Sequence, residues 1–194
     1  GCFGYPRASY HRGAFWRGEI PLWNPLSDCG LPFLAQWNTL VLYPGSLIYL
    51  LLPLPWSLCF FCLVHLWSGG MTMRWLAFEW TGHRLGAAFA GMAYALNGLS
   101  VNALMWPNNV AALAWAPAVV VLVERASRQG GRAVFAAALV GALQMLTGAP
   151  ELIVFTWIAA TAFALTGGSS LSRDGAVHPG ERVGLARTGA RPAG

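Results

Sequence analysis

Two long stretches without charge dominate this sequence. Residues 85–123 contain no Asp, Glu, Lys, Arg or His, and residues 133–172 contain one charged side chain, that of Glu151. A helix needs roughly 20 apolar residues to cross the hydrocarbon core of a bilayer. Charge-free stretches of this length are typical of segments that insert into lipid. The sequence therefore predicts an integral membrane protein.

The composition agrees with this prediction. Hydrophobic residues make up 56% of the chain and charged residues only 10%, whereas soluble domains carry about 25% charged residues. The net charge is +5, but all twelve basic residues are arginines, and nine of them lie between or after the apolar segments. Nucleic-acid-binding proteins instead gather basic residues on one face. We therefore interpret the arginines as topology signals and expect no nucleic acid partner.

Five apolar segments approach the length of a membrane span. They comprise residues 56–73, 85–105, 110–123, 133–147 and 152–166. A Gly-Ala-Pro sequence at 148–150 separates the last two, and because it interrupts an α-helix it predicts a tight turn. We expect an all-α integral membrane protein, a polytopic helical bundle of about five spans, with an extracytoplasmic N-terminal loop.

The loops between these segments differ in their arginine content. The connections at 74–84 and 124–132 and the C-terminal tail are rich in Arg, whereas the turns at 106–109 and 148–151 contain none. Short loops that carry positive charge stay in the cytoplasm. The alternation therefore predicts that the N-terminal segment is extracytoplasmic and that the tail is cytoplasmic.

The prediction divides the chain into three parts. Residues 1–55 form an extracytoplasmic loop, of which the proline-interrupted apolar end, 39–54, lies on the outer membrane surface or dips into the bundle. Residues 56–166 form the transmembrane bundle, and residues 167–194 a disordered Arg/Gly-rich tail. Because the chain begins at Gly1 in a polar loop, we expect a further segment upstream. Three arginines of the first part depart from the alternation and are candidates for binding an anion: Arg7, Arg12 and Arg17.

Residues 18–44 concentrate the polar and aromatic side chains of the first part. Aromatic rings stack on sugar rings, and carboxylates and amides bind hydroxyl groups, so this loop is a candidate sugar site. Its acids are Glu19 and Asp28. The residues that we expect to bind substrate are Arg17, Trp23, Asn24, Gln36, Asn38 and Tyr43. In the alternative interpretation, Trp23 and Asn24 only pack the loop, and Asp28 caps a turn.

Two further polar residues lie among the apolar segments. Glu151 either favours a helix N-terminus after Pro150 or belongs to a polar site. His65 has no acid within one helical turn, so we interpret it as a packing residue. We expect no metal site and no cofactor, because the chain has neither a metal-ligand cluster nor a glycine-rich phosphate loop.

Six short motifs follow one another in the first 160 residues. They are PLWNP at 21–25, GLPFLAQ at 30–36, YP at 43–44, AYALNG at 93–98, AWAP at 114–117 and GAPE at 148–151. In order and spacing they resemble the YfhO-like bacterial membrane proteins, which belong with the C-superfamily of membrane glycosyltransferases. The resemblance implies a multi-pass protein of the bacterial cell membrane that transfers a sugar from a polyprenyl-phosphate donor to an extracytoplasmic cell-envelope acceptor. Membrane lipids are the other expected partners.

Two features depart from the pattern of the family. Ala149 stands where the family often has His, and the essential acid that these enzymes usually place just after their first span would lie upstream of Gly1. The chain would then be an N-terminal fragment that lacks the first span. Within it, Asp28 and Glu151 are the candidate catalytic acids. Whether it is an enzyme stays open, because a non-catalytic membrane lipid-binding or transport protein and an inactive truncated fragment are the alternatives.

Overall fold

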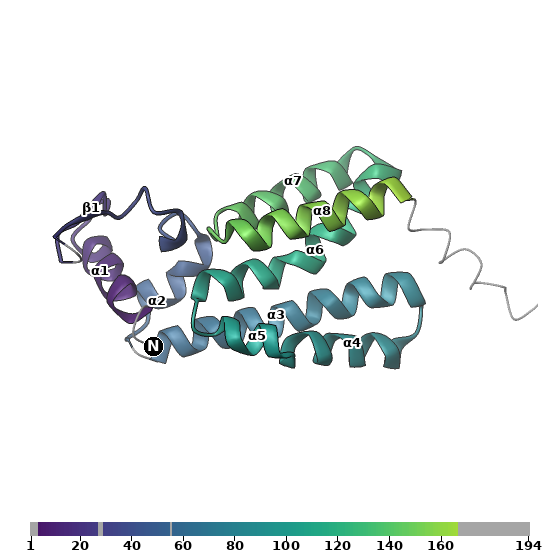
Figure 1. Cartoon of the computed structure of the whole chain (residues 1–194), viewed down its shortest axis with the longest axis horizontal. Helices are drawn as coiled ribbons and strands as arrows, with labels where there is room; N and C mark the ends of the chain where they lie inside the picture. Colours follow the sequence, from purple (N-terminus) through teal and green to yellow (C-terminus); the bar gives the residue numbers. More distant parts are fainter. Residues whose placement is uncertain (1–3, 27–28, 55, 167–194) are drawn as a thin grey trace, which may run out of the picture.

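The computed structural model describes residues 4–26, 29–54 and 56–166. These residues form a mainly helical protein in which an N-terminal part lies at one end of a bundle of long helices (Figure 1). The helical fold class predicted from the sequence is confirmed. Asp28 and the predicted tail, residues 167–194, lie outside the described residues.

The bundle is organised around one central helix. Helix α6 packs against α3 on one side and against α7 and α8 on the other, and α3 also packs against α4 (Figure 1). The helices of the bundle are α3 (Trp56–Thr81), α4 (Arg84–Leu96), α5 (Gly98–Ala103), α6 (Pro107–Gln129), α7 (Arg132–Met145) and α8 (Pro150–Thr166). The predicted turn at 148–150 is confirmed, since α7 ends and α8 begins there.

Length and surface both associate the bundle with a membrane. Among the described helices, α3 and α6 are long and apolar enough to cross a bilayer, by length and composition. α7 and α8 are apolar but shorter. Large apolar side chains cover the outward faces of the bundle, as on α4, where four are at least 59% exposed: Leu85, Phe89, Met92 and Leu96. Soluble monomers rarely expose contiguous apolar faces of this kind.

The predicted span at 85–105 is interrupted in the structure. α4 ends at Leu96, and Asn97 caps the start of α5 by accepting a hydrogen bond from the amide of Ser100 (2.9 Å). The Asn97 amide also donates to the carbonyl of Tyr94 (2.7 Å). Because Asn side chains compete with helical hydrogen bonds in this way, the AYALNG motif encodes the break.

The long helices extend further than hydropathy predicts at the arginine-rich end. α3 continues to Thr81 and α6 to Gln129, so that the connection between α6 and α7 shrinks to Gly130 and Gly131. Arg and Glu are good helix formers although they are polar. In α6 the ion pair between Glu124 and Arg128, four residues apart, supports the added turn.

Pro117 lies inside α6 and removes a helical donor. A proline has no N–H for the carbonyl four residues earlier, which here belongs to Leu113. Side chains from neighbouring helices donate to the carbonyls around this position: Tyr94 to Leu113 (2.9 Å), Thr72 to Ala114 (3.0 Å) and Gln144 to Ala112 (3.3 Å). Such compensation is what makes proline tolerable in a membrane helix, and it explains how the AWAP motif fits in the centre of the bundle.

The N-terminal part contains a helix that the sequence did not predict. It consists of α1 (Gly4–Trp16), a short antiparallel pair of strands β1 (Trp23–Asn24) and β2 (Leu31–Pro32), the 3-10 turns η1 (Trp37–Thr39) and η2 (Pro44–Ser46), and α2 (Leu47–Leu51). The buried face of α1 carries Ala8, His11 and Ala14. α1 packs against α2, and α2 packs against α3.

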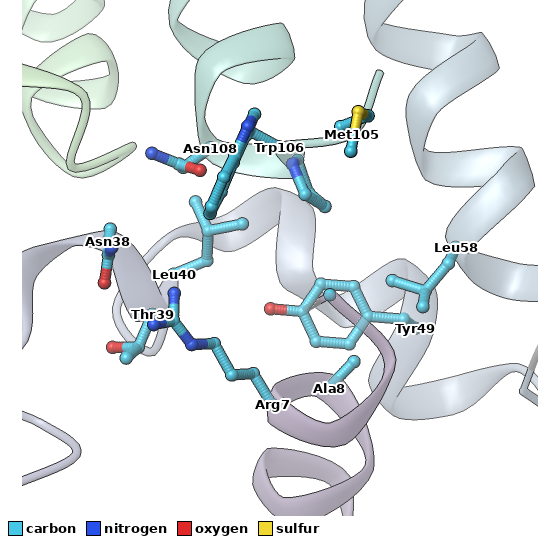
Figure 2. A pocket seen from close by; sticks show the side chains of 12 residues that line it. Arg7, Ala8, Asn38, Thr39, Leu40, Tyr49, Leu58, Met105, Trp106 and Asn108 are labelled. Atoms are coloured by element: carbon cyan, nitrogen blue, oxygen red, sulfur yellow. The ribbon is translucent and has the colours of Figure 1, made fainter. Parts of the chain in front are cut away.

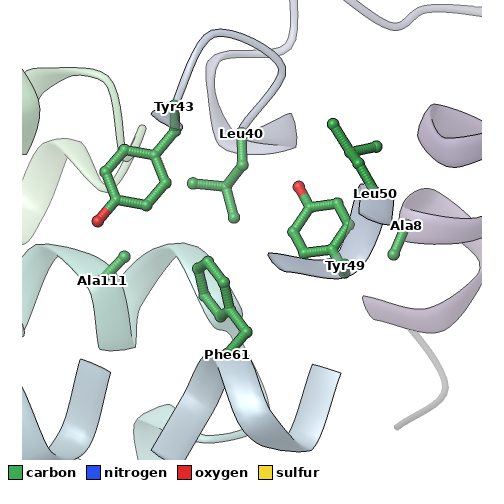
Figure 3. Packing of buried hydrophobic residues seen from close by; sticks show 7 residues of the cluster. All are labelled: Ala8, Leu40, Tyr43, Tyr49, Leu50, Phe61 and Ala111. Carbon is green, nitrogen blue, oxygen red and sulfur yellow. The ribbon is translucent and has the colours of Figure 1, made fainter. Parts of the chain in front are cut away.

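A hydrophobic cluster fastens this part to the bundle. Tyr43, Tyr49 and Phe61 pack together, with Leu40 and Ala111 beside them (Figure 3). Phe61 belongs to α3 and Ala111 to α6, so residues from the whole N-terminal part share one core with the two long helices. Residues 39–54 therefore pack against the end of the bundle.

Candidate functional site

Three turns that are far apart in sequence meet where the N-terminal part contacts the bundle. The Trp37 indole donates to the carbonyl of Met145 (2.8 Å), and the Asn108 amide donates to the carbonyl of Gly148 (3.3 Å). Gly148 lies directly against the backbone of Trp37. These contacts bring the turn η1, the start of α6 and the GAPE turn into one assembly, which we call the N-proximal end of the bundle.

A small cavity of about 30 Å³ lies at this end (Figure 2). Arg7, Asn38 and Asn108 supply polar groups to its lining, and Leu58 and Met105 contribute apolar wall. The side chain of Arg7 extends from α1 toward Thr39 and Leu40 (Figure 2). The cavity thus combines the cation of Arg7 with the amide of Asn38, which are donors that suit an anion. The amide nitrogen of Asn108 already donates to Asn109 and Gly148.

Arg7 differs from the other two arginines of α1 and its flank. Arg12 donates to the carbonyl of Leu50 (3.2 Å), and Arg17 forms an ion pair with Glu19 (2.8 Å). Arg7 is half-buried, and no described residue forms a hydrogen bond or an ion pair with its guanidinium. A partly buried cation without a partner is costly, so this side chain is suited to an external anion.

An apolar groove of about 570 Å³ adjoins the small cavity. The two share Gly4, Leu58, Met105 and Pro107 in their linings. The groove continues along α3 and past α5, where its wall is formed by Cys59, Cys62, Leu63 and Leu104. Together they form an amphipathic site, with room for an apolar chain and a cationic pocket at one end.

A second groove, of about 630 Å³, runs along α1. Two of the predicted substrate-binding residues, Arg17 and Asn24, line it together with Tyr5 and Tyr10. Asn24 is buried, and its Oδ1 accepts a hydrogen bond from the amide of Leu26 (3.0 Å). Asn24 therefore packs the loop, as the alternative interpretation stated, and also lies beside a groove.

The other predicted loop residues occupy different places. Asn38 lines the small cavity. Trp23 is 54% exposed, and its ring lies over Gly30, where an added Cβ would come within 2.7 Å of it. The carbonyl of Gln36 accepts a hydrogen bond from the Thr39 hydroxyl (2.8 Å). Neither Trp23 nor Gln36 lines the cavities described above.

Tyr43 is buried at the centre of a hydrogen-bonded triad. The indole of Trp115 donates to its Oη (2.8 Å), and Oη lies 2.7 Å from Nε2 of His65. His65 Nδ1 lies 2.8 Å from the carbonyl of Phe61 and must carry the proton, so the Tyr43 hydroxyl donates to Nε2. Burial raises the pKa of Tyr43 to about 12. The interpretation of His65 as a satisfied packing residue is confirmed, and Tyr43 links the loop to α3 and α6.

Of the two candidate catalytic acids, Glu151 does not line any of these cavities. Glu151 is exposed in the first turn of α8, a position that suits the helix dipole. No acid among the described residues lines the small cavity or the apolar groove, and Asp28 lies outside the described residues. Within the described part of the chain, no three His, Cys, Asp or Glu side chains are grouped closely enough to hold a metal.

Comparison of the chain with protein-family models, with curated proteins and with solved structures finds no match. The function therefore has to be argued from the site itself. Its main element is Arg7, which the sequence marked, together with Arg12 and Arg17, as an exception to the charge alternation and a candidate for binding an anion. No sequence pattern marked the apolar groove, because its wall combines α3 with the start of α1 and with the segment that follows α5.

Proposed function

We propose that this chain is part of a polytopic bacterial membrane protein of the glycosyltransferase type. It binds a polyprenyl-phosphate sugar at its extracytoplasmic end and transfers the sugar to an acceptor of the cell envelope. The observation that carries the proposal is the adjacency of an apolar groove and half-buried Arg7, whose guanidinium has no partner among the described residues. An apolar chain that ends in a phosphate has this same arrangement of groups.

In this proposal, the polyprenyl chain and the phosphate of the donor bind to different parts of the site. The polyprenyl chain lies in the groove between Leu58, Cys62 and Leu104, where it removes apolar surface from water. The phosphate accepts charge-assisted hydrogen bonds from Arg7. The groove along α1 shares Tyr5 with the apolar groove, so the sugar and its acceptor extend toward Arg17 and Asn24.

Transfer needs a base and a stabilised leaving group. The base takes the proton of the acceptor hydroxyl, the acceptor oxygen bonds to the anomeric carbon, and the bond from that carbon to the phosphate oxygen breaks. Arg7 offsets the charge on the departing polyprenyl phosphate. Asp28 and Glu151 are the candidate bases in this chain.

The proposed topology has five spans: α3, α4 with α5, α6, α7 and α8. Two arginine-free turns and the N-terminal part share one end of the bundle, and Arg84, Arg128 and Arg132 lie toward the other. In a variant without native cysteines, Cys at Glu151 is expected to react with an impermeant maleimide from outside, and Cys at Gln129 only after permeabilisation. Both positions are exposed. Equal labelling from one side would contradict the five-span topology.

Arg7→Gln tests the donor site. We expect the affinity for a polyprenyl phosphate to fall roughly tenfold, because one charge-assisted hydrogen bond is lost. Binding is measured on the purified chain in detergent by tryptophan quenching. The control is Arg84→Gln, which removes the same charge at an exposed position at the opposite end of the bundle. If both variants bind as the unaltered chain does, Arg7 is not the phosphate partner.

The absence of an acid from the lining formed by described residues favours a second candidate, a non-catalytic lipid-binding or transport protein. Both functions require Arg7 for binding, but only the enzyme requires a base. In the full parent protein, Asp28→Asn and Glu151→Gln should each retain lipid binding. If neither variant lowers sugar transfer per molecule of membrane-inserted protein, neither acid is the catalytic base. If the unaltered parent protein binds the lipid but transfers no sugar, the non-catalytic function is correct.

A further inference from the structure

A second polar cavity lies at the other end of the bundle, between the C-terminal ends of α3 and α6. Its volume is about 170 Å³. The residues that line it and matter here are Glu79, Trp80, Glu124, Arg125, Arg128 and Gln129. None of them belongs to the site proposed above, and we call it the distal cavity.

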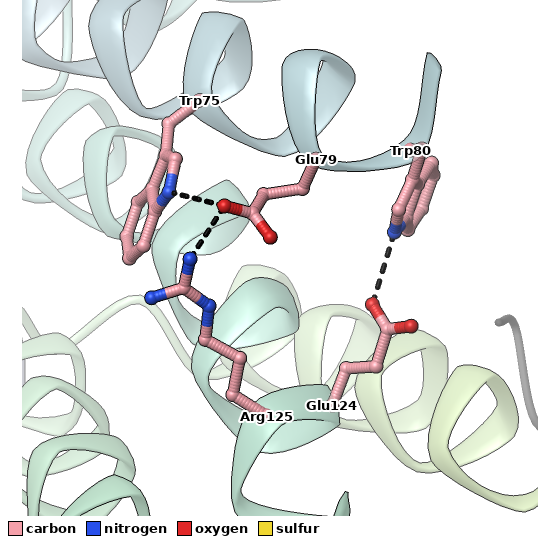
Figure 4. A network of polar contacts seen from close by, with 5 residues as sticks. All are labelled: Trp75, Glu79, Trp80, Glu124 and Arg125. Atoms are coloured by element: carbon pink, nitrogen blue, oxygen red, sulfur yellow. Dashed lines mark hydrogen bonds and ion pairs between the residues drawn. The ribbon is translucent and has the colours of Figure 1, made fainter. Parts of the chain in front are cut away.

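The charges around the distal cavity are balanced. Glu79 pairs with Arg125, and Glu124 pairs with Arg128. Trp75 and Trp80 donate their indole N–H groups to Glu79 (3.3 Å) and Glu124 (2.9 Å), and Arg125 also lies over the Trp75 ring (Figure 4). Glu124 is only 8% exposed. The two carboxylates and two guanidinium groups leave the cavity with no net charge, which disfavours a ligand that carries a net charge.

The carboxylate of Glu79 and the two guanidinium groups can nevertheless form further hydrogen bonds. Both hydrogen bonds to Glu79 go to Oε1, and the second oxygen points away from these partners (Figure 4). Among the described residues nothing bonds to that oxygen. Each guanidinium donates through one nitrogen to its carboxylate, although arginine has five N–H donors. The cavity thus offers one free carboxylate acceptor and several cationic donors.

We propose that the distal cavity binds the headgroup of a zwitterionic phospholipid with a primary ammonium, phosphatidylethanolamine in chemical class. The ammonium donates to the second oxygen of Glu79 beside the indole rings, and the phosphate accepts from Arg128. The acyl chains lie against the exposed apolar side chains on the surface of the bundle. This assignment uses the proposed membrane orientation only to place the cavity at the cytoplasmic headgroup level.

Two competing ligands fit less well. Phosphatidylglycerol brings a phosphate but has no ammonium for Glu79, and it adds a net negative charge beside two carboxylates. A phosphatidylcholine headgroup has a quaternary ammonium with no N–H to donate. The distal cavity should therefore distinguish these headgroups by the hydrogen bonds that they form. Hydrogen bonding separates close analogues better than differences in size do.

The test is native mass spectrometry of the purified full chain with phosphatidylethanolamine, phosphatidylglycerol or phosphatidylcholine of the same acyl composition. We expect phosphatidylethanolamine to bind at least about fivefold more than either other lipid, since a hydrogen bond to a charged group is worth this much or more. Glu79→Gln should remove the preference. Gln129→Trp, which fills the cavity without breaking an ion pair, should lower occupancy even if Glu79→Gln fails to fold.

The controls separate this site from the donor site. Arg132→Gln removes an exposed cation at the same end of the bundle and should leave the preference intact, as should Arg7→Gln. Soluble phosphoethanolamine at equal concentration should not displace the lipid, because it lacks acyl chains. Equal binding of the three lipids would overturn the proposal whatever happens at Arg7. So would an unchanged preference in Glu79→Gln together with an unchanged occupancy in Gln129→Trp.

Discussion

Replacing Gly148 with alanine is expected to prevent the N-terminal part from docking on the bundle. Gly148 has a φ of +68°, and an added Cβ would lie closer than 3.0 Å to the carbonyl carbon and oxygen of Trp37 and to the amide of Asn38. These are backbone atoms, which have no rotamer to move to. The change should therefore cost more than about 4 kcal/mol, the range in which steric and backbone strain dominate.

Gly130 provides the matched control for this prediction. It also has a positive φ, +63°, in a turn between two bundle helices, but an added Cβ there would meet nothing within 4 Å. With φ at +63° and ψ at −161°, Gly130→Ala should cost only the backbone strain, about 1 to 3 kcal/mol. Unfolding in detergent, followed by tryptophan fluorescence and gel filtration, measures both variants. Equal losses of stability would show that the contact between Gly148 and Trp37 is not a tight one.

Removing the hydroxyl of Tyr43 should have the next largest effect. Tyr43→Phe leaves Nε2 of His65 without its donor and the indole N–H of Trp115 without its acceptor. Each buried polar group without a partner costs about 1 to 3 kcal/mol. The variant should therefore lose about 2 to 4 kcal/mol of stability while keeping the shape of the ring.

Tyr10→Phe is the control for the triad. It removes one hydroxyl that donates to the carbonyl of Trp23 (2.6 Å) in an exposed setting, where water replaces the lost bond, so we expect less than about 1 kcal/mol. The readout is the midpoint of unfolding of the two variants under the same conditions. If Tyr43→Phe shifts the unfolding midpoint no more than Tyr10→Phe does, the triad does not hold the loop.

Hydropathy predicted the helices of the bundle better than their ends. The apolar segments are visible in the sequence as long runs without charge, and the turn at 148–150 as a Gly-Ala-Pro sequence that interrupts a helix. The break at Asn97 is not, since one amide within an apolar run changes hydropathy little while it replaces helical hydrogen bonds. α1 escaped prediction for a related reason. Its buried residues are Ala8, His11 and Ala14, which carry too little apolar surface to produce a helical period.

The candidate site was predictable in its region but not in its residues. The polar and aromatic loop does lie beside the small cavity, which Asn38 lines. It also lies beside the groove along α1, which Arg17 and Asn24 line. Tyr43 shows the limit, because residue type alone does not distinguish a ring that stacks on a ligand from one that is buried against Phe61. Arg7 was visible as an unexpected cation, but where α1 packs decides that no described residue pairs with it.

The contact between Trp37 and Met145 spans 108 residues of sequence, and this separation has a consequence in time. At synthesis rates of about 5 to 20 residues per second, the loop emerges roughly 5 to 20 s before the GAPE turn exists for it to dock on. During that interval the aromatic side chains of the loop cannot pack against the GAPE turn. A ribosome pause placed after α6 should therefore lengthen the period in which the N-terminal part is open to proteolysis.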